Sequence, residues 1–398
     1  MSFASYQPNF IHFETNQQTP PSIKSTDVHE IKNATVFVSD TFEETGVYDE
    51  NGNLCSESIL LRKTNELPKS IHKNIHGIDF IDETVIYLGC CYLMQHFGHF
   101  LVEGMARTYA LLYKKYQNIK VVVAYENKIA MPGYVRMFLN ALGVRDKDII
   151  VIYKPTRFAR VFVPVQAMNA GLYISPIMNR VFDTVALNLA DKKCKTYDKI
   201  YLSRSAMNDG RTFGEKTVEK IFEKNGYKII HPEKLALGQQ IALARGAREM
   251  AGTAGSALHM ALFMKPNGRV IQIKRNSDNT DNIDIQKIIC DLRKLDLVWV
   301  FGSIEENPTP HYTQIPQIIG ITKNMLDFFD DNGFRYNTND IAPDLAEIKK
   351  YKRQLQKYKL HGIYRKISDI PVRLVSLVGI TKHGRKIVRE YLRKKLHV

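Results

Sequence analysis

Four polar residues in one short segment have the spacing of a helix face and the side-chain types used in proton transfer. His96, His99, Glu103 and Arg107 are separated by three, four and four residues, which at 3.6 residues per turn places them in one stripe. An imidazole and a carboxylate four residues apart are suited to taking a proton from a hydroxyl group. Either Glu103 is the base or it orients His99 as the base, and we expect Arg107 to keep Glu103 ionised or to bind an acidic acceptor. The alternative is an internal polar network that braces the fold.

A second candidate group is a pair of arginines in the sequence RSAMNDGRTFG. Arg204 and Arg211 follow the apolar run KIYLS and precede a helical pattern. Two guanidiniums on a glycine-bearing turn between a strand and a helix suit bidentate binding of a phosphate or a carboxylate. The alternative interpretation is a solvated loop with ordinary surface arginines.

A third candidate group is the glycine-rich segment AGTAGSALHM. Gly252 and Gly255 flank small residues, and Ser256 is expected to cap a helix that runs to Met264. Free backbone amides at a helix N-terminus can hold an anion such as a diphosphate. We expect His259, in the first turn of that helix, to donate to a phosphate or a ribose. A tight turn with a buried histidine is the structural alternative.

The elements that must position these groups follow a regular pattern in the second half of the chain. From about Asp198, short β-rich runs alternate with helical patterns of ten or more residues, which predicts βαβ units, a parallel sheet and a Rossmann-like domain. Ligands of such sheets lie at the carboxyl ends of the strands. The first half predicts a second α/β domain, with five strands, a helix at about 93–115 and another at about 132–142. A helix at about 175–193 is expected to join the halves.

Several motifs together resemble glycosyltransferase family 61, whose bacterial members include capsular polysaccharide biosynthesis proteins. The similarity extends over roughly residues 90–275. It is carried by the following residues, in chain order: His99, Glu103, Arg107, Ser203, Arg204, Arg211, Pro232, Leu235 to Gln240, Gly252 to Leu258, and LFM at 262–264.

The resemblance implies a fold and a reaction. It implies a GT-B-like α/β architecture of two Rossmann-like domains facing across a cleft. The corresponding domains are residues 1–175 on the acceptor side, residues 176–335 for the nucleotide sugar, and a basic helical tail at 336–398. It also implies an inverting transfer from a nucleotide-sugar donor, which we expect to be UDP-linked, to a hydroxyl of a growing capsular or other surface glycan.

The expected catalytic residues are Glu103, His99 and Arg107. The expected donor-binding residues are Arg204, Arg211, Gly252, Gly255, Ser256 and His259. We expect no metal and no other cofactor, because the arginines and backbone amides can neutralise the departing diphosphate. Asp146 and Asp148 form a DxD sequence, but they precede a strand and are interpreted as turn and surface acids.

Composition places the chain among ordinary globular proteins of a reducing compartment. Hydrophobic residues make up 44% and charged residues 24% of its 398 residues, and no apolar run reaches the ~18 residues of a spanning helix. The amino terminus lacks a basic and apolar leader, and the five cysteines lack metal or disulfide spacing. We therefore expect a cytoplasmic protein, with peripheral attachment to the inner face of the membrane as an option.

The net charge of +15 is concentrated at the carboxyl end. Residues 341–398 contain 16 Lys and Arg against four Asp and Glu. Apolar residues at helical spacing accompany the cations near the end of this tail, namely Ile387, Val388, Tyr391, Leu392 and Leu396. Such a helix can lie on an anionic membrane, where a glycan or glycolipid acceptor would be found, although it could also pack on the body or be solvated.

Two other functions fit parts of the sequence. The enzyme alternative is a transferase that uses a CMP-linked sugar. The alternative outside enzymes is a basic-tailed Rossmann protein that binds polyanions or nucleic acid. We expect no nucleic-acid partner, because the sequence has no helix-turn-helix, zinc-finger or RNP signature.

Overall fold

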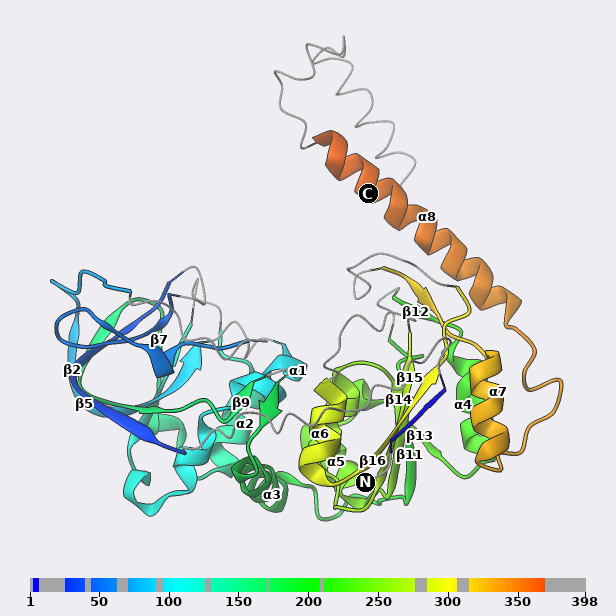
Figure 1. Ribbon diagram of the computed structural model, residues 1–398, viewed down its shortest axis with the longest axis horizontal. Coiled ribbons are helices and arrows are strands. Elements are labelled where there is room, and N and C mark those ends of the chain that lie inside the picture. The colour runs from blue at the N-terminus through cyan, green and yellow to red at the C-terminus, as the bar shows by residue number, and fades with distance from the viewer. Residues whose placement is uncertain are drawn as a thin grey trace, which may run out of the picture.

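The described part of the computed structural model contains two large β-sheets and two short two-stranded ones, with helices packed between and around the large sheets (Figure 1). The residues that it describes are 3–6, 26–39, 44–62, 71–90, 96–125, 130–169, 172–207, 211–275, 285–305 and 315–368.

The second half of the chain forms a six-stranded sheet in which every neighbouring pair is parallel. Its order is β1, β16, β15, β14, β11, β13. The strands are β1 (Phe3–Tyr6), β11 (Lys199–Leu202), β13 (Lys228–Ile230), β14 (Glu249–Thr253), β15 (Arg269–Lys274) and β16 (Asp296–Phe301). The central strands are buried along nearly their whole length, because helices cover both faces of a parallel sheet.

Helices cover the two faces of this sheet in separate groups. One face packs against α4 (Glu215–Lys224) and α7 (Lys323–Asp331). The other face packs against α5 (Leu237–Gly246), the 3-10 helix η9 (Ser256–Phe263) and α6 (Ile285–Arg293). In Figure 1, α4 and α7 lie on the far side of the sheet from the first half of the chain, and α5 and α6 lie on the near side. The predicted Rossmann-like sheet of this half is confirmed.

The strand order creates a topological switch point beside β11. From β11 the chain moves to β13 on one side, and after β13 it returns to β14 on the other side. Loops at the carboxyl ends of β11 and β14 therefore diverge, and this is the position at which open α/β sheets bind ligands. The two anion-binding segments predicted from the sequence are the loops that leave these two strands.

Strand β1 is an addition that the sequence pattern did not indicate. Residues 3–6 pair in parallel with β16 and form the edge of the six-stranded sheet, so that the start of the chain lies in the sheet of the second half.

The first half forms a seven-stranded sheet of mixed direction. Its order is β4, β3, β2, β8, β5, β6, β7. The strands are β2 (Val28–Phe37), β3 (Gly46–Tyr48), β4 (Leu54–Cys55), β5 (Phe80–Cys90), β6 (Lys120–Ala124), β7 (Ile149–Ile152) and β8 (Thr156–Pro164). The five strands predicted from the sequence are all present. The antiparallel pairing of β2 with β8 and β3, and of β3 with β4, was not predicted.

A continuous apolar core joins the two halves. Helices α2 (Gly133–Ala141) and α3 (Ile177–Leu189) confirm the predicted helices near 132–142 and 175–193. Their buried residues belong to one cluster with β6 of the first sheet and with α5 and η9 of the second half. Phe263 of η9, for example, contacts Phe138 and Phe182 through ring edges or tilted faces. This core holds the two sheets in a defined relation.

The prediction of one regular helix over about 93–115 is wrong. Among the described residues of that range, Phe97–His99 is α-helical, Phe100–Gly104 (η3) forms a π-helical turn, and Thr108–Leu112 is a 3-10 helix. The π turn is closed by the Met105 amide, which donates to the Phe100 carbonyl at 2.9 Å. The sequence pattern is apolar and helical in period, but tertiary packing divides it into three kinds of turn.

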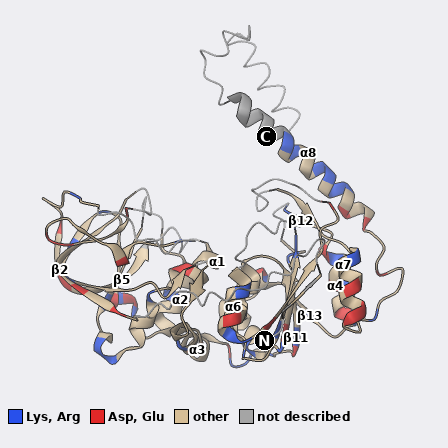
Figure 2. Cartoon of the chain, in the orientation of Figure 1, with Lys and Arg blue, Asp and Glu red and all other residues tan. Residues whose placement is uncertain are grey.

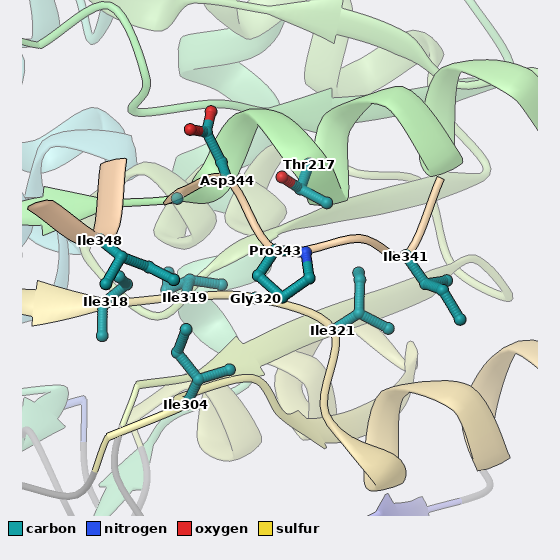
Figure 3. A pocket seen from close by; sticks show the side chains of 11 residues that line it. Thr217, Ile304, Ile318, Ile319, Gly320, Ile321, Ile341, Pro343, Asp344 and Ile348 are labelled. Atoms are coloured by element: carbon teal, nitrogen blue, oxygen red, sulfur yellow. The ribbon is translucent and has the colours of Figure 1, made fainter. Parts of the chain in front are cut away.

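A long basic helix, α8 (Leu345–Ser368), leaves the body of the molecule (Figures 1 and 2). Its first turns are anchored: Tyr351 is buried against Phe213, and Ile348 lines a small apolar pocket with Ile318 and Ile341 (Figure 3). Residues 369–398, which include the tail residues predicted to be amphipathic, lie outside the described part. Within the described helices, none is both long and apolar enough to span a bilayer.

Candidate active site

The first candidate group forms a hydrogen-bonded pair with an added arginine. His99 Nδ1 lies 2.7 Å from Glu103 Oε2, and Arg62 Nε donates to Glu103 Oε1 at 2.8 Å. The Glu103 side chain is 0% exposed, whereas the His99 side chain is 40% exposed. A carboxylate only accepts hydrogen bonds, so the contact places the ring proton on Nδ1 and leaves the Nε2 lone pair free for another partner.

The spacing of four residues brings these two side chains together, and the second of them lies in a π turn. His99 ends the short helix α1 (Phe97–His99), and Glu103 lies within the wider turn that follows. Such turns are frequent at functional sites because they redirect one side chain without ending the helix. The contact between His99 and Glu103 confirms the predicted pairing, although the predicted continuous stripe does not exist.

Arg107 occupies a different environment from the one expected. It is 2% exposed, and its Nη2 donates to the carbonyls of Glu57, Ser58 and Ile59 at 2.8, 3.0 and 2.9 Å. Together with Glu103 it lines a small interior cavity. A buried guanidinium that binds three successive carbonyls holds the 57–59 turn in place, so it is not exposed to an acidic acceptor.

The second and third candidate groups meet at the switch point. Leu202 of β11 pairs with Gly252 of β14, so Arg204 and Gly255 leave neighbouring strand ends. A Cβ on Gly252 would stand 2.8 Å from the Leu202 carbonyl oxygen, and one on Gly255 would stand 3.5 Å from Arg204 Nη1. The Arg204 guanidinium therefore lies against the backbone of the loop from Gly252 to Ser256, which we call the glycine loop.

The glycine loop has a backbone that requires glycine. Gly255 has φ 154° and ψ 175°, a conformation found essentially only in glycine. The helix that follows is a 3-10 helix, and no side chain caps it. The expectation that Ser256 caps an α-helix is therefore wrong, because Gly255 occupies the cap position and Ser256 is exposed.

His259 lies one turn into η9 and is half-buried. Its Nδ1 lies 3.2 Å from Gln286 Oε1 of α6. The amide oxygen accepts from the ring, which fixes the orientation of the imidazole toward the start of α6.

The two halves of the predicted site come into direct contact through Gly98. A Cβ on Gly98 would stand 2.6 Å from Ser256 Cβ and 3.4 Å from His259 Cδ2. Only glycine permits this approach, because real Cβ atoms essentially never come within 3.0 Å of another heavy atom. His99, the next residue, is thereby placed beside the loop that carries Ser256.

Arg211 lies on an exposed stretch before β12 (Thr212–Phe213). Its carbonyl accepts from the Gln317 amide at 2.8 Å, where β12 pairs with β17 (Gln317–Ile318). Residues 208–210, which connect it to the Arg204 turn, lie outside the described part.

Two residues of this region were missed by the sequence reasoning. Arg62, which pairs with Glu103, comes from a segment with no recognisable motif, so only the fold could reveal it. Glu215 is 2% exposed and accepts hydrogen bonds from the Arg204 amide, the Tyr201 hydroxyl and the Thr253 hydroxyl. Its position directly after the glycine of RTFG and at the first residue of a helix was the available signal.

Asp146 is exposed in a turn, as predicted, but the prediction that Asp148 is a surface acid is wrong, because Asp148 is buried. Asp146 and Asp148 lie in a 3-10 turn before β7, and Asp148 pairs with Arg145 at 2.5 Å. The described residues contain no group of three His, Cys, Asp or Glu side chains that could hold a metal ion.

The comparison with known families agrees with this geometry. Residues 97–271 match the family model of glycosyltransferase 61. The matched segment begins in α1 and ends in β15, so it contains the His99 pair and both switch-point loops. The matched residues, which make up less than half of the chain, are therefore similar to glycosyltransferase family 61, and this similarity supports the activity class of a glycosyltransferase. No curated protein matches the chain.

Proposed function

We propose that the protein is an inverting glycosyltransferase with a GT-B-like division of labour between its two halves. The donor is a nucleotide sugar, UDP-linked in the first instance, and the acceptor is a hydroxyl of a growing capsular or other surface glycan. The observation that carries the proposal is the Gly98 contact, because it brings a histidine–glutamate pair of the first half beside the anion-binding loops of the second half. The family match supports the same class of reaction.

His99 is the proposed base, and Glu103 is the residue that orients it. The Glu103 carboxylate is closed off from solvent and already accepts from His99 and Arg62, so an acceptor hydroxyl cannot approach it. The imidazole is exposed and presents Nε2. A buried carboxylate behind a histidine fixes its tautomer and stabilises the imidazolium that forms when it takes a proton.

The switch-point loops are the proposed site of the donor diphosphate. Arg204, Arg211 and the amides of the Gly252 to Ser256 loop supply positive charge where the leaving group becomes more negative, and His259 is a further donor. This set of groups needs no metal ion.

The proposed reaction is a single displacement. The acceptor oxygen attacks the anomeric carbon of the donor sugar, and the bond from that carbon to the diphosphate oxygen breaks on the opposite face. The hydroxyl proton passes to His99 Nε2, and the electron pair of the broken bond stays on the diphosphate. Inversion of the anomeric configuration follows from the single attack.

Binding of nucleotides tests this proposal against its alternatives. Calorimetric titration with UDP, GDP and CMP identifies the base that is held, and tight binding of CMP alone would favour the CMP-sugar alternative. A screen of donor hydrolysis across UDP-, GDP- and CMP-sugars then identifies the sugar. Salt-sensitive binding of generic duplex DNA at nanomolar concentration, with no nucleotide binding, would instead favour the polyanion-binding alternative.

The basic helix α8 is the proposed contact with an anionic membrane surface on the cytoplasmic side. From Ile348 to Ser368 the sequence contains no acidic residue. Ile348 and Tyr351 anchor the helix on the body, and Leu355 and Tyr358 continue the same apolar stripe, with the Tyr358 side chain exposed. An apolar stripe flanked by cations is suited to the headgroup region of a membrane.

Vesicle co-sedimentation tests the role of α8. The full chain should bind vesicles containing phosphatidylserine and not vesicles of phosphatidylcholine alone. Each cation lost near the surface reduces binding by about 1 kcal/mol, so glutamine at Lys352, Arg353, Lys357 and Lys359 together should reduce it strongly. Equal binding by this variant, and by a chain ending at Pro343, would refute the membrane role.

A further inference from the structure

The Arg204 turn and the glycine loop are separate segments that must keep a fixed spacing if they are to hold one diphosphate. They leave neighbouring strands, and their described contact is the approach of the Arg204 guanidinium to Gly255. A guanidinium on a long side chain does not by itself fix the distance between two loops. A brace beneath both loops would do so.

Glu215 is placed as such a brace. Its Oε2 accepts from the Arg204 amide at 2.9 Å, and its Oε1 accepts from the Thr253 hydroxyl at 3.3 Å and the Tyr201 hydroxyl at 3.0 Å. One carboxylate therefore joins the end of β11, the turn that follows it and the end of β14 to the first residue of α4.

We propose that Glu215 is a positioning residue of the donor site, which holds the Arg204 turn and the glycine loop at the spacing that a diphosphate requires. This inference rests on the proposed function, because it assigns the geometry of the same site. Glu215 is buried and does not itself contact the donor; it acts through the two loops.

The chemistry of the contacts explains why an acidic residue is found here. A carboxylate has two oxygens that can accept from three donors at once. Burial raises the pKa of Glu215 to about 7. The charged and titratable groups that face it are Tyr201 on β11, Arg204 on the following turn and Glu219 on α4.

The test measures the affinity of UDP and GDP for the full chain by calorimetry. Glu215→Ala should weaken binding at least about tenfold, as expected for loss of hydrogen bonds to a charged group. Glu215→Gln should stay within about threefold of the wild type, because its oxygen can still accept from the Arg204 amide while its amino group donates to the two hydroxyls. Glu223→Ala, which removes an exposed glutamate of the same helix, is the matched control and should bind normally.

A milder variant covers the case in which Glu215→Ala fails to fold. Thr253→Val removes only the hydroxyl that joins β14 to the carboxylate, and it should weaken nucleotide binding about threefold with an unchanged melting temperature. In the Arg204→Ala background it should have no further effect on affinity, because it acts through the placement of Arg204. A merely structural change would instead lower affinity by the same factor in both backgrounds.

The outcomes separate this inference from the proposed function. If the wild type binds neither UDP nor GDP, the diphosphate site itself is wrong and the inference is overturned with it. If the wild type binds and both Glu215→Ala and Thr253→Val bind equally well, the positioning role alone is overturned.

Discussion

The two halves of the site are built in opposite ways. The donor side uses regular structure: two parallel strands end side by side at a switch point, and their loops hold Arg204 and Gly255 together. The proposed acceptor side uses irregular structure, in which a short helix is followed by a π turn that contains Glu103, the partner of His99. The position of the two loops follows from the repeated βαβ architecture, whereas the π turn at Phe100–Gly104 is a local departure from regular structure.

The two sides also differ in the hydrogen-bond partners of their buried carboxylates. The acceptor-side carboxylate is buried with two cationic or potentially cationic partners, His99 and Arg62. On the proposed donor side the carboxylate is Glu215, which is buried and accepts from the Arg204 backbone amide and from two hydroxyl groups. The first arrangement fixes the orientation of an imidazole, and the second joins two loops through one carboxylate.

The largest effect should follow from breaking the acceptor-side pair. Glu103→Gln removes the negative charge that stabilises a protonated His99, and its single amide oxygen cannot accept from both His99 and Arg62, so transfer should fall at least ~100-fold while nucleotide affinity changes little. Initial rates of sugar transfer and calorimetric nucleotide binding measure the two quantities. His99→Gln is the companion variant, and it should lose at least as much turnover. Near-normal transfer by Glu103→Gln would remove the pair from the mechanism.

The next effect should appear on the donor side. Arg204→Ala removes a guanidinium from the glycine loop, and affinity for the nucleoside diphosphate should fall about 30-fold, as expected for a charge-assisted contact. Arg248→Ala is a matched control, since Arg248 is an exposed arginine of the same half. Unaltered affinity in Arg204→Ala would contradict the placement of the diphosphate at the switch point.

Regular elements of this fold could be predicted from the sequence, whereas irregular ones could not. The alternating strands and helices after Asp198 could be predicted from the sequence, because the apolar periodicity indicates a parallel sheet. The sheet in turn determines where the loops between its elements lie. The π turn at Phe100–Gly104 could not be predicted from the sequence. A π turn and an α-helix have the same apolar pattern, and tertiary packing determines which of them forms. Arg62 was unpredictable for a related reason: its partner is 41 residues away in the chain.

A substitution at the contact between Gly98 and Ser256 should have a smaller effect on the transfer rate. Gly98→Ala would place a Cβ 2.6 Å from Ser256 Cβ, so the two loops must separate and transfer should fall about tenfold through misplacement of His99. In a helix exposed to solvent the same change would stabilise by up to about 1 kcal/mol, so helix propensity cannot explain a loss.

A second substitution tests whether the contact itself is responsible. Ser256→Gly removes the atom that the new methyl group meets, and in the Gly98→Ala background it should restore most of the transfer rate. Transfer rates of the two single variants and the double variant form a cycle. Additive losses would show that Gly98 and Ser256 act independently, which is inconsistent with a shared junction.

The smallest effect is a pH dependence of stability that comes from the buried Glu215. Burial raises the pKa of Glu215 from 4.5 to about 7 in the folded protein, so the folded state favours the protonated form. Its contribution to stability is fully present below the unfolded pKa of about 4.5 and is lost as pH rises through about 7. At about 1.4 kcal/mol for each pKa unit, the loss is on the order of 3 kcal/mol at most.

Glu215→Gln cannot titrate, so the melting temperature of the wild type should fall relative to this variant by a few degrees between pH 5 and pH 8. Differential scanning calorimetry of both proteins across that range isolates this carboxyl, because the two proteins differ only at residue 215. If the melting temperatures of the two proteins change with pH in parallel, the Glu215 carboxyl makes no contribution to the pH dependence of stability, and its pKa is not raised by burial.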